Sequence, residues 1–242
     1  MPLASAYHRP HSIEEAVTLL TGHNRVALAG GTIVNADREH AGIEVVDLQA
    51  LRLAGVSSDG TRVIIGAMTS LAALADSDQL GDDLRAIARA ELPSTLRTRA
   101  TVGGTVAAMQ SESVLAAALL AADGQAEVIG GAGAATLPLA DLYRRGLAPG
   151  RLITSVDIAA GARLAVAGTG RTPADTPIVA AVAHRLGSTT TVALTGVADT
   201  PILIDPAEPA RGLEPPDDFR ASAGYRRHLA AIVTRRALEA LS

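Results

Sequence analysis

Two double-glycine segments decide how this chain is interpreted: LAGGT at residues 28–32 and ATVGGT at residues 100–105. The first directly follows a short apolar run, and each segment ends in a threonine. Glycine lacks the Cβ that blocks close approach and disfavours positive φ, so each segment predicts a sharp turn. Consecutive N–H groups in such a turn form a concave anion site. Although a single Gly-Gly pair is usually just a turn, the two together predict a ligand with a pyrophosphate held between them.

The standard nucleotide-binding and catalytic motifs are absent from the sequence. It contains no G-x-G-x-x-G and no G-x-x-x-x-G-K-[ST], so a nucleotide would not bind in a Rossmann or P-loop manner. It also lacks H-E-x-x-H and G-x-S-x-G, and its six histidines are scattered. We therefore predict neither a catalytic residue nor a metal site in this chain.

Composition narrows the class of protein further. The 242 residues are 48% hydrophobic but only 2% aromatic, and the net charge of −4 offers no basic face, which argues against nucleic-acid binding. Without cysteine, the chain forms no disulfide and cannot itself ligate an iron–sulfur cluster through thiolates. The longest apolar run, 114–122, is far shorter than the roughly 20 residues of a membrane span. No signal peptide is visible at the N-terminus, so we expect a cytoplasmic protein that binds no membrane.

The pattern of apolar residues predicts an α+β fold of two or three subdomains, because helices and strands do not alternate strictly. Expected helices lie at 13–21, 70–76, 82–91, 113–122 and 220–241, and expected strands at 26–29, 43–48, 62–65, 126–129, 152–158, 178–186 and 189–196. Ser12 and Glu15 form a capping box at the first helix. The pairs at 59–60 and 187–188 predict hairpin turns. Segments 130–135 and 167–176 are expected to be loops, and 205–217 a linker.

Eight segments in a fixed order carry a resemblance that covers residues 7–241. They are LAGGT, VVDL, IGAMTSLAAL, LRTRATVGGT, LAPGRLITSVDI, RTPADTPIVAAVA, VALTGVADTP and YRRHLAAIVTRRAL. In this order they resemble the FAD-binding medium subunit of molybdenum hydroxylases, the family of carbon monoxide dehydrogenase and xanthine dehydrogenase flavoproteins. The resemblance implies a two-subdomain FAD-binding region of the molybdopterin-dehydrogenase flavoprotein type at 1–160, divided near residue 55. A C-terminal α+β domain with a small antiparallel sheet would follow at 161–242.

The resemblance also implies a function as an oxidoreductase subunit. Electrons would pass from the [2Fe–2S] clusters of a small partner subunit through FAD to an acceptor, while a large partner subunit carries the molybdenum cofactor. Carried over position by position, the expected FAD contacts are Ala29, Gly30, Gly31, Thr32, Thr69, Thr101, Val102, Gly103, Gly104, Thr105 and Ile153.

Three positions depart from the family pattern. Ile33 stands where an acidic or polar residue is usual, Thr105 where asparagine is usual, and Val114 where aspartate is usual. Each lost polar contact would weaken FAD binding, by about 1.5–3 kcal/mol where it is charged. Two alternatives therefore stay open: a family member that has lost flavin and serves as a structural subunit, or a stand-alone protein that binds another ligand in the same cleft.

Overall fold

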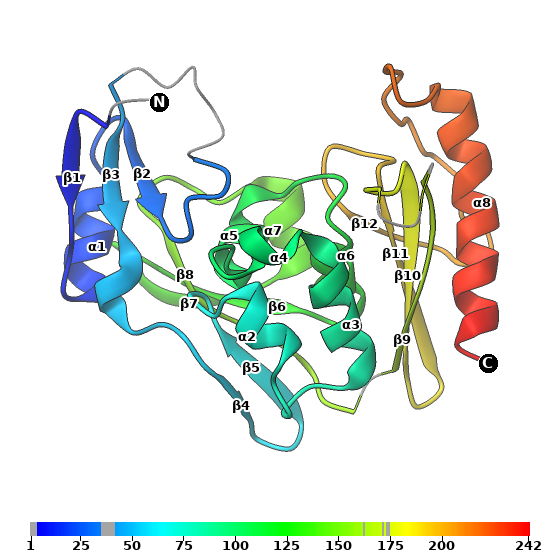
Figure 1. Ribbon diagram of the computed structural model, residues 1–242, viewed down its shortest axis with the longest axis horizontal. Helices are drawn as coiled ribbons and strands as arrows, with labels where there is room; N and C mark the ends of the chain where they lie inside the picture. Colours follow the sequence, from blue (N-terminus) through cyan, green and yellow to red (C-terminus); the bar gives the residue numbers. More distant parts are fainter. Residues whose placement is uncertain (1–3, 35–41, 162, 171, 173–174) are drawn as a thin grey trace.

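Three β-sheets and the helices that cover them make up the computed structural model, which describes residues 4–34, 42–161, 163–170, 172 and 175–242. The sheets follow one another along the longest axis in sequence order (Figure 1). One is parallel and two are antiparallel, each with at least one helix in contact with it. The predicted α+β class, including the C-terminal antiparallel sheet, is confirmed.

The N-terminal sheet has the order β1-β3-β2 and packs against α1. Its elements are β1 (Ala6–His8), α1 (Ile13–Leu20), β2 (Arg25–Leu28), β3 (Glu44–Asp47) and the short 3₁₀ helix η1 (Leu48–Leu51). Ser12 caps α1 by accepting the N–H of Glu15, as the sequence predicts. The Glu15 carboxylate reaches back to the N–H of His11 at 2.8 Å, one residue before the capping-box partner. These two hydrogen bonds fix the start of α1 directly after Ser12.

The central sheet is antiparallel with the order β4-β5-β8-β6-β7. Its strands are β4 (Val56–Ser58), β5 (Arg62–Gly66), β6 (Gln125–Gly130), β7 (Gly133–Pro138) and β8 (Leu152–Ala159). Six helices belong to this region: α2 (Leu71–Ala75), α3 (Asp82–Glu91), α4 (Ser94–Arg97), α5 (Val102–Ala108), α6 (Val114–Ala121) and α7 (Leu139–Arg145). In α6 every residue after the first is buried, because this alanine- and leucine-rich helix contacts α3 as well as strands of the next sheet.

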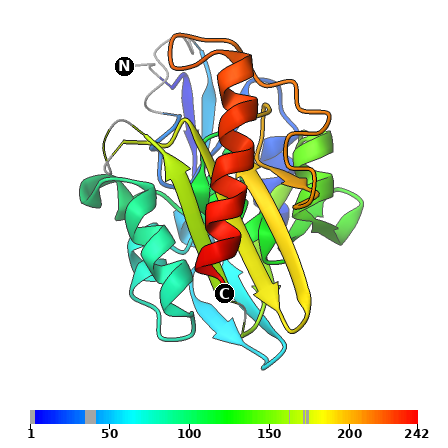
Figure 2. The same cartoon turned by 90° about the vertical axis from the view of Figure 1, so that its right-hand side faces the viewer.

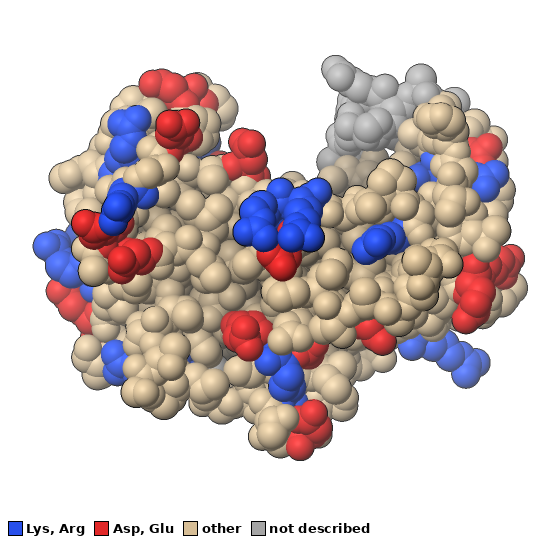
Figure 3. All heavy atoms as spheres, turned by 180° about the vertical axis from the view of Figure 1, so that it is seen from behind, with Lys and Arg blue, Asp and Glu red and all other residues tan. Residues whose placement is uncertain are grey.

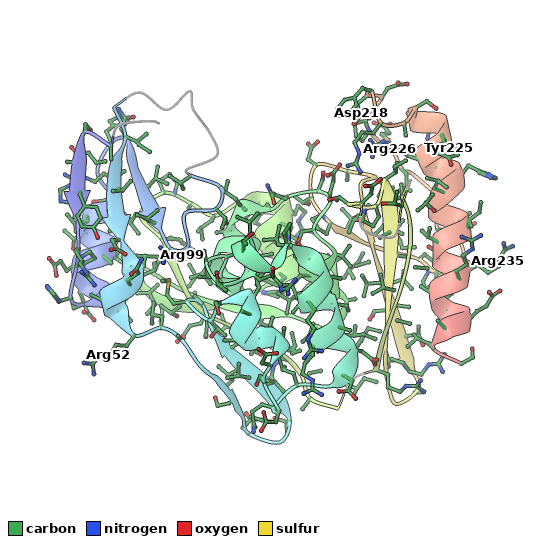
Figure 4. The ribbon with its side chains drawn as sticks, in the orientation of Figure 1. Arg52, Arg99, Asp218, Tyr225, Arg226 and Arg235 are labelled. Atoms are coloured by element: carbon green, nitrogen blue, oxygen red, sulfur yellow. The ribbon has the colours of Figure 1, made fainter. Side chains whose placement is uncertain are left out.

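The C-terminal sheet, β12-β11-β10-β9, is antiparallel and is covered by the last helix, as Figure 2 shows. Its elements are β9 (Arg163–Thr169), β10 (Val179–Leu186), β11 (Thr189–Thr195), β12 (Ile202–Ile204) and α8 (Ala223–Ala240). Arg226 of α8 is fully buried, and its guanidinium donates to both carboxylate oxygens of Asp218 at 2.8 and 2.7 Å (Figure 4). The same group donates to the carbonyl oxygens of Ile178 and Gly196, so one side chain ties α8 to the sheet.

Three local predictions were wrong. Segment 130–135, expected as a loop, contains the β6–β7 turn and the start of β7. Segment 167–176, also expected as a loop, begins inside β9, which continues to Thr169; several later residues of this segment lie outside the described residues. Both strands were missed because glycine, alanine and threonine in a partly exposed edge strand give little apolar alternation. The second double glycine is not a turn but lies within the first turn of α5.

Candidate ligand-binding site

A cavity of about 440 Å³ lies between the turn that follows β2 and helices α4 and α5. This volume is within the roughly 300–1,000 Å³ typical of small-molecule sites. Most of its wall is apolar, with side chains from β2, η1, α5 and β8. Both double-glycine segments contribute to the wall, although about seventy residues of chain separate them.

The two double-glycine segments come together through direct backbone contact. A Cβ built on Gly30 would lie 1.8 Å from the carbonyl oxygen of Arg99, so only glycine permits this approach. Gly31 adopts a φ of +73°, a conformation that L side chains rarely adopt. Glycine is therefore required at these two positions for different reasons, steric at Gly30 and conformational at Gly31.

The turn after β2 presents free hydrogen-bond donors to the cavity. Within the described residues, no acceptor contacts the backbone N–H groups of Gly30, Gly31 or Thr32, and all three residues line the cavity. Consecutive unpaired N–H groups at a positive-φ turn form a site that accepts an anionic oxygen. This turn can therefore hold a phosphate-like group.

The second double glycine differs from the expected anion site. The N–H of Val102 donates to the Thr69 carbonyl, and the N–H of Gly103 donates to the Ala67 carbonyl at 2.8 Å. The N–H of Gly104 donates to the Thr101 hydroxyl that caps α5. A Cβ on Gly103 would lie 2.6 Å from that of Ala67, so this glycine serves helix packing. The prediction of a turn with free N–H groups was therefore wrong here. The segment is the capped start of a helix, and its first N–H groups already have protein partners.

Nine of the eleven predicted contact residues line the cavity: Ala29, Gly30, Gly31, Thr32, Thr101, Gly103, Gly104, Thr105 and Ile153. Val102 and Thr69 do not, and both are buried. The Thr69 hydroxyl instead accepts from the N–H of Gly55 at 2.9 Å and donates to the carbonyl of the same residue. Ile33 lines the cavity and Val114 does not.

Glu91 is a cavity residue that the sequence analysis missed. It is the last residue of α3, and its carboxylate accepts hydrogen bonds from the Ser113 hydroxyl and from the N–H of Leu115 at 2.8 Å. Burial raises the pKa of Glu91, and these hydrogen bonds only partly oppose the effect. No motif marks this residue, since the contact partners follow it by more than twenty positions.

Charges are few around the cavity. Arg99 is exposed beside the turn after β2, as Figure 4 shows, and no carboxylate among the described residues pairs with it. Its backbone carbonyl is the group that contacts Gly30. Figure 3, the view from behind, shows acidic and basic side chains interspersed with wide uncharged areas. A continuous basic surface is therefore absent from this face.

The described residues contain neither a candidate metal-binding cluster nor a candidate membrane-spanning helix. No group of three His, Asp or Glu side chains could hold a metal ion there. None of the described helices has the length and apolar character that a membrane crossing requires.

Comparison with known proteins agrees with the resemblance seen in the sequence. The family model described as FAD binding domain in molybdopterin dehydrogenase matches residues 3–160. The carbon monoxide dehydrogenase medium chain of Afipia carboxidovorans is 31% identical over 283 residues, with 99% of this chain and 97% of that protein covered.

Solved structures show the same similarity in three dimensions. Reconstituted CO dehydrogenase from Oligotropha carboxidovorans superposes with a TM-score of 0.88 at 28% identity. Carbon monoxide dehydrogenase from Hydrogenophaga pseudoflava superposes with a TM-score of 0.91 at 25% identity. Each comparison covers 99% of this chain and 98% of the other. The chain therefore belongs to the molybdopterin dehydrogenase FAD-binding family, and it has the fold of the carbon monoxide dehydrogenase medium subunit.

Proposed function

We propose that this chain binds FAD in the cavity between its two double-glycine segments and serves as the electron-transfer subunit of a molybdenum hydroxylase. The observation that supports it most is the cavity itself, which nine of the eleven predicted contact residues line. Membership of an FAD-binding family supports FAD as the ligand. The FAD-binding region is proposed to comprise residues 1–160, with a C-terminal domain at 161–242.

In this proposal the residues of the chain bind and orient the cofactor. The free N–H groups of Gly30, Gly31 and Thr32 would hold its pyrophosphate. The apolar wall that includes Met68 and Ile153 would contact the ring and exclude water from it. The isoalloxazine ring supplies the redox chemistry of such a subunit, and the protein supplies position and electrostatics.

The proposal requires partner subunits. The chain has no cysteine, so thiolate-bound iron–sulfur clusters must come from another chain. We expect a small subunit with [2Fe–2S] clusters and a large subunit with the molybdenum cofactor.

An absorption spectrum tests the proposal directly. The purified full chain would be recorded from 300 to 600 nm, mixed with excess FAD, desalted and recorded again. Flavin bands that survive desalting support the proposal. A flat spectrum after reconstitution contradicts FAD binding by this chain.

A structural subunit without flavin is the second candidate. Two observations favour it: the first N–H groups of α5 are occupied by protein acceptors, and Ile33 puts an apolar side chain at the cavity wall. Affinity purification of the tagged chain from its native host separates the candidates. A colourless chain that co-purifies with molybdenum and iron–sulfur subunits would indicate a structural role. A colourless chain that purifies alone would indicate a stand-alone protein with another ligand.

A further inference from the structure

Glu91 is the only charged side chain among the described residues that line the cavity. The other residues of the wall are apolar side chains, glycines, threonines and one glutamine, Gln110. A half-buried carboxylate in such a wall is costly unless it receives hydrogen bonds. Hydrogen-bond donors must therefore surround the Glu91 carboxylate to stabilise it.

The protein fixes the position of this carboxylate. Oε1 accepts from the hydroxyl of Ser113, which itself caps α6 by accepting the N–H of Ala116 at 3.0 Å. Oε2 accepts from the N–H of Leu115. On the other side, Arg97 donates to the carbonyl of Leu92, which holds the chain after α3. The carboxylate is thus pre-positioned before any ligand arrives.

These contacts leave acceptor capacity unused. An ionised carboxylate has about four lone-pair positions, and donors from Ser113, Leu115 and the backbone of Val114 occupy three of them. No Arg, Lys or His in the described part of the chain pairs with Glu91. One position is left, and because Glu91 lines the cavity, a ligand there can supply the donor.

We propose that Glu91 is a ligand-binding residue that accepts hydrogen bonds from hydroxyl groups of the molecule in the cavity. The inference rests on the proposed function, in which these hydroxyls belong to the polyol chain that joins the flavin ring to the pyrophosphate. A phosphate group at the same place would be repelled by the carboxylate. The cavity therefore offers an acceptor at Glu91 and free N–H donors at Gly30, Gly31 and Thr32, which suit different parts of one ligand.

The test compares two ligands on the full chain. FAD and ADP share the adenosine pyrophosphate, but ADP lacks the flavin polyol. We expect Glu91→Gln to weaken FAD binding about tenfold to hundredfold, the usual effect of losing a charge-assisted hydrogen bond. ADP binding is expected to stay unchanged, because ADP lacks the polyol hydroxyls that Glu91 would accept from. Isothermal titration gives both constants.

Glu127→Gln is the matched control. Its carboxylate also accepts two hydroxyl hydrogen bonds, from Thr154 and Ser155, but it lies outside the cavity wall. This variant should bind both ligands as the wild type does. If Glu91→Gln fails to fold, Glu91→Asp replaces it, because aspartate keeps the charge but withdraws the carboxylate, and the same FAD-selective loss is expected.

Three outcomes would overturn the inference. Equal losses for FAD and ADP would show that Glu91 acts only by stabilising the fold. An unchanged FAD constant in Glu91→Gln, with wild-type binding intact, would refute the role of Glu91 alone. Failure of the wild type to bind FAD would refute the proposed function, and the assignment of Glu91 with it.

Discussion

Replacing Gly30 by alanine forces the two double-glycine segments apart. The new Cβ would lie 1.8 Å from the Arg99 carbonyl oxygen and 2.5 Å from its carbon, whereas real Cβ contacts are essentially never closer than 3.0 Å. The obstacle is backbone, so a side-chain rotation cannot relieve it. The turn and the segment before α5 must therefore separate by more than an ångström.

The expected cost is that of overpacking a tight interface, about 1–3 kcal/mol. For a protein of this size such a loss lowers the melting temperature by roughly 2–12 °C. The same displacement moves the free N–H groups of residues 30–32 away from α5, so FAD affinity should fall as well. Thermal denaturation followed by circular dichroism measures the first effect, and titration with FAD measures the second.

Gly131→Ala provides the matched control. Gly131 lies between β6 and β7, where an added Cβ meets nothing within 4 Å. This variant should melt and bind FAD as the wild type does. If Gly30→Ala matches the control in both measurements, the close approach of the two segments is not what requires glycine, and the reasoning is refuted.

Three further substitutions test contacts elsewhere in the fold. Arg226→Met should lower the free energy of unfolding, because it leaves two carbonyls unpaired at about 1–3 kcal/mol each. The hydrogen bond from Arg226 lowers the pKa of Asp218 below its ordinary value of 3.8. The pair therefore stabilises the wild type fully above pH 3.8, and in urea denaturation this stabilisation should be lost as the pH falls below that value. The variant should lack this acid-dependent loss, and a variant as stable as the wild type would contradict the contact. Tyr143→Phe should be neutral or stabilising, since the hydroxyl is buried without a partner in the described residues; a loss above about 1 kcal/mol on thermal melting would reveal one. Thr69→Val should cost about 1–3 kcal/mol in the same assay by breaking both bonds to Gly55, with FAD affinity little changed; a selective loss of FAD binding would instead place Thr69 at the ligand.

Local sequence signals were enough to predict several elements of the fold, but not helices α4 and α5 beside the cavity. The cap at Ser12, the hairpin turn at 59–60 and the apolar helix at 113–122 each depend on neighbouring residues, and each is found. The double glycines correctly marked close approach at Gly30. At Gly103 the same signal was misread as a turn, because glycine is also required where a helix packs tightly on Ala67.

Long-range contacts were not predictable in this way. Glu91 meets the first turn of α6 more than twenty residues later, and Arg226 bonds to carbonyls thirty and forty-eight residues away. Neither residue belongs to a local pattern, and both look like ordinary charges on amphipathic helices. Their roles depend on how the helices pack, which one sequence does not reveal.

The burial of α6 on all sides has a consequence for the modularity of the chain. This helix contacts β10 and β11 as well as α3, and the Thr191 hydroxyl donates to the carbonyl of Ala121 at its end. One apolar cluster accordingly runs from the central sheet into Leu164, Val182 and Ala193 of the C-terminal sheet. Replacing the last eighty residues by an unrelated domain would disrupt this shared core. We therefore expect the two regions to be inherited together.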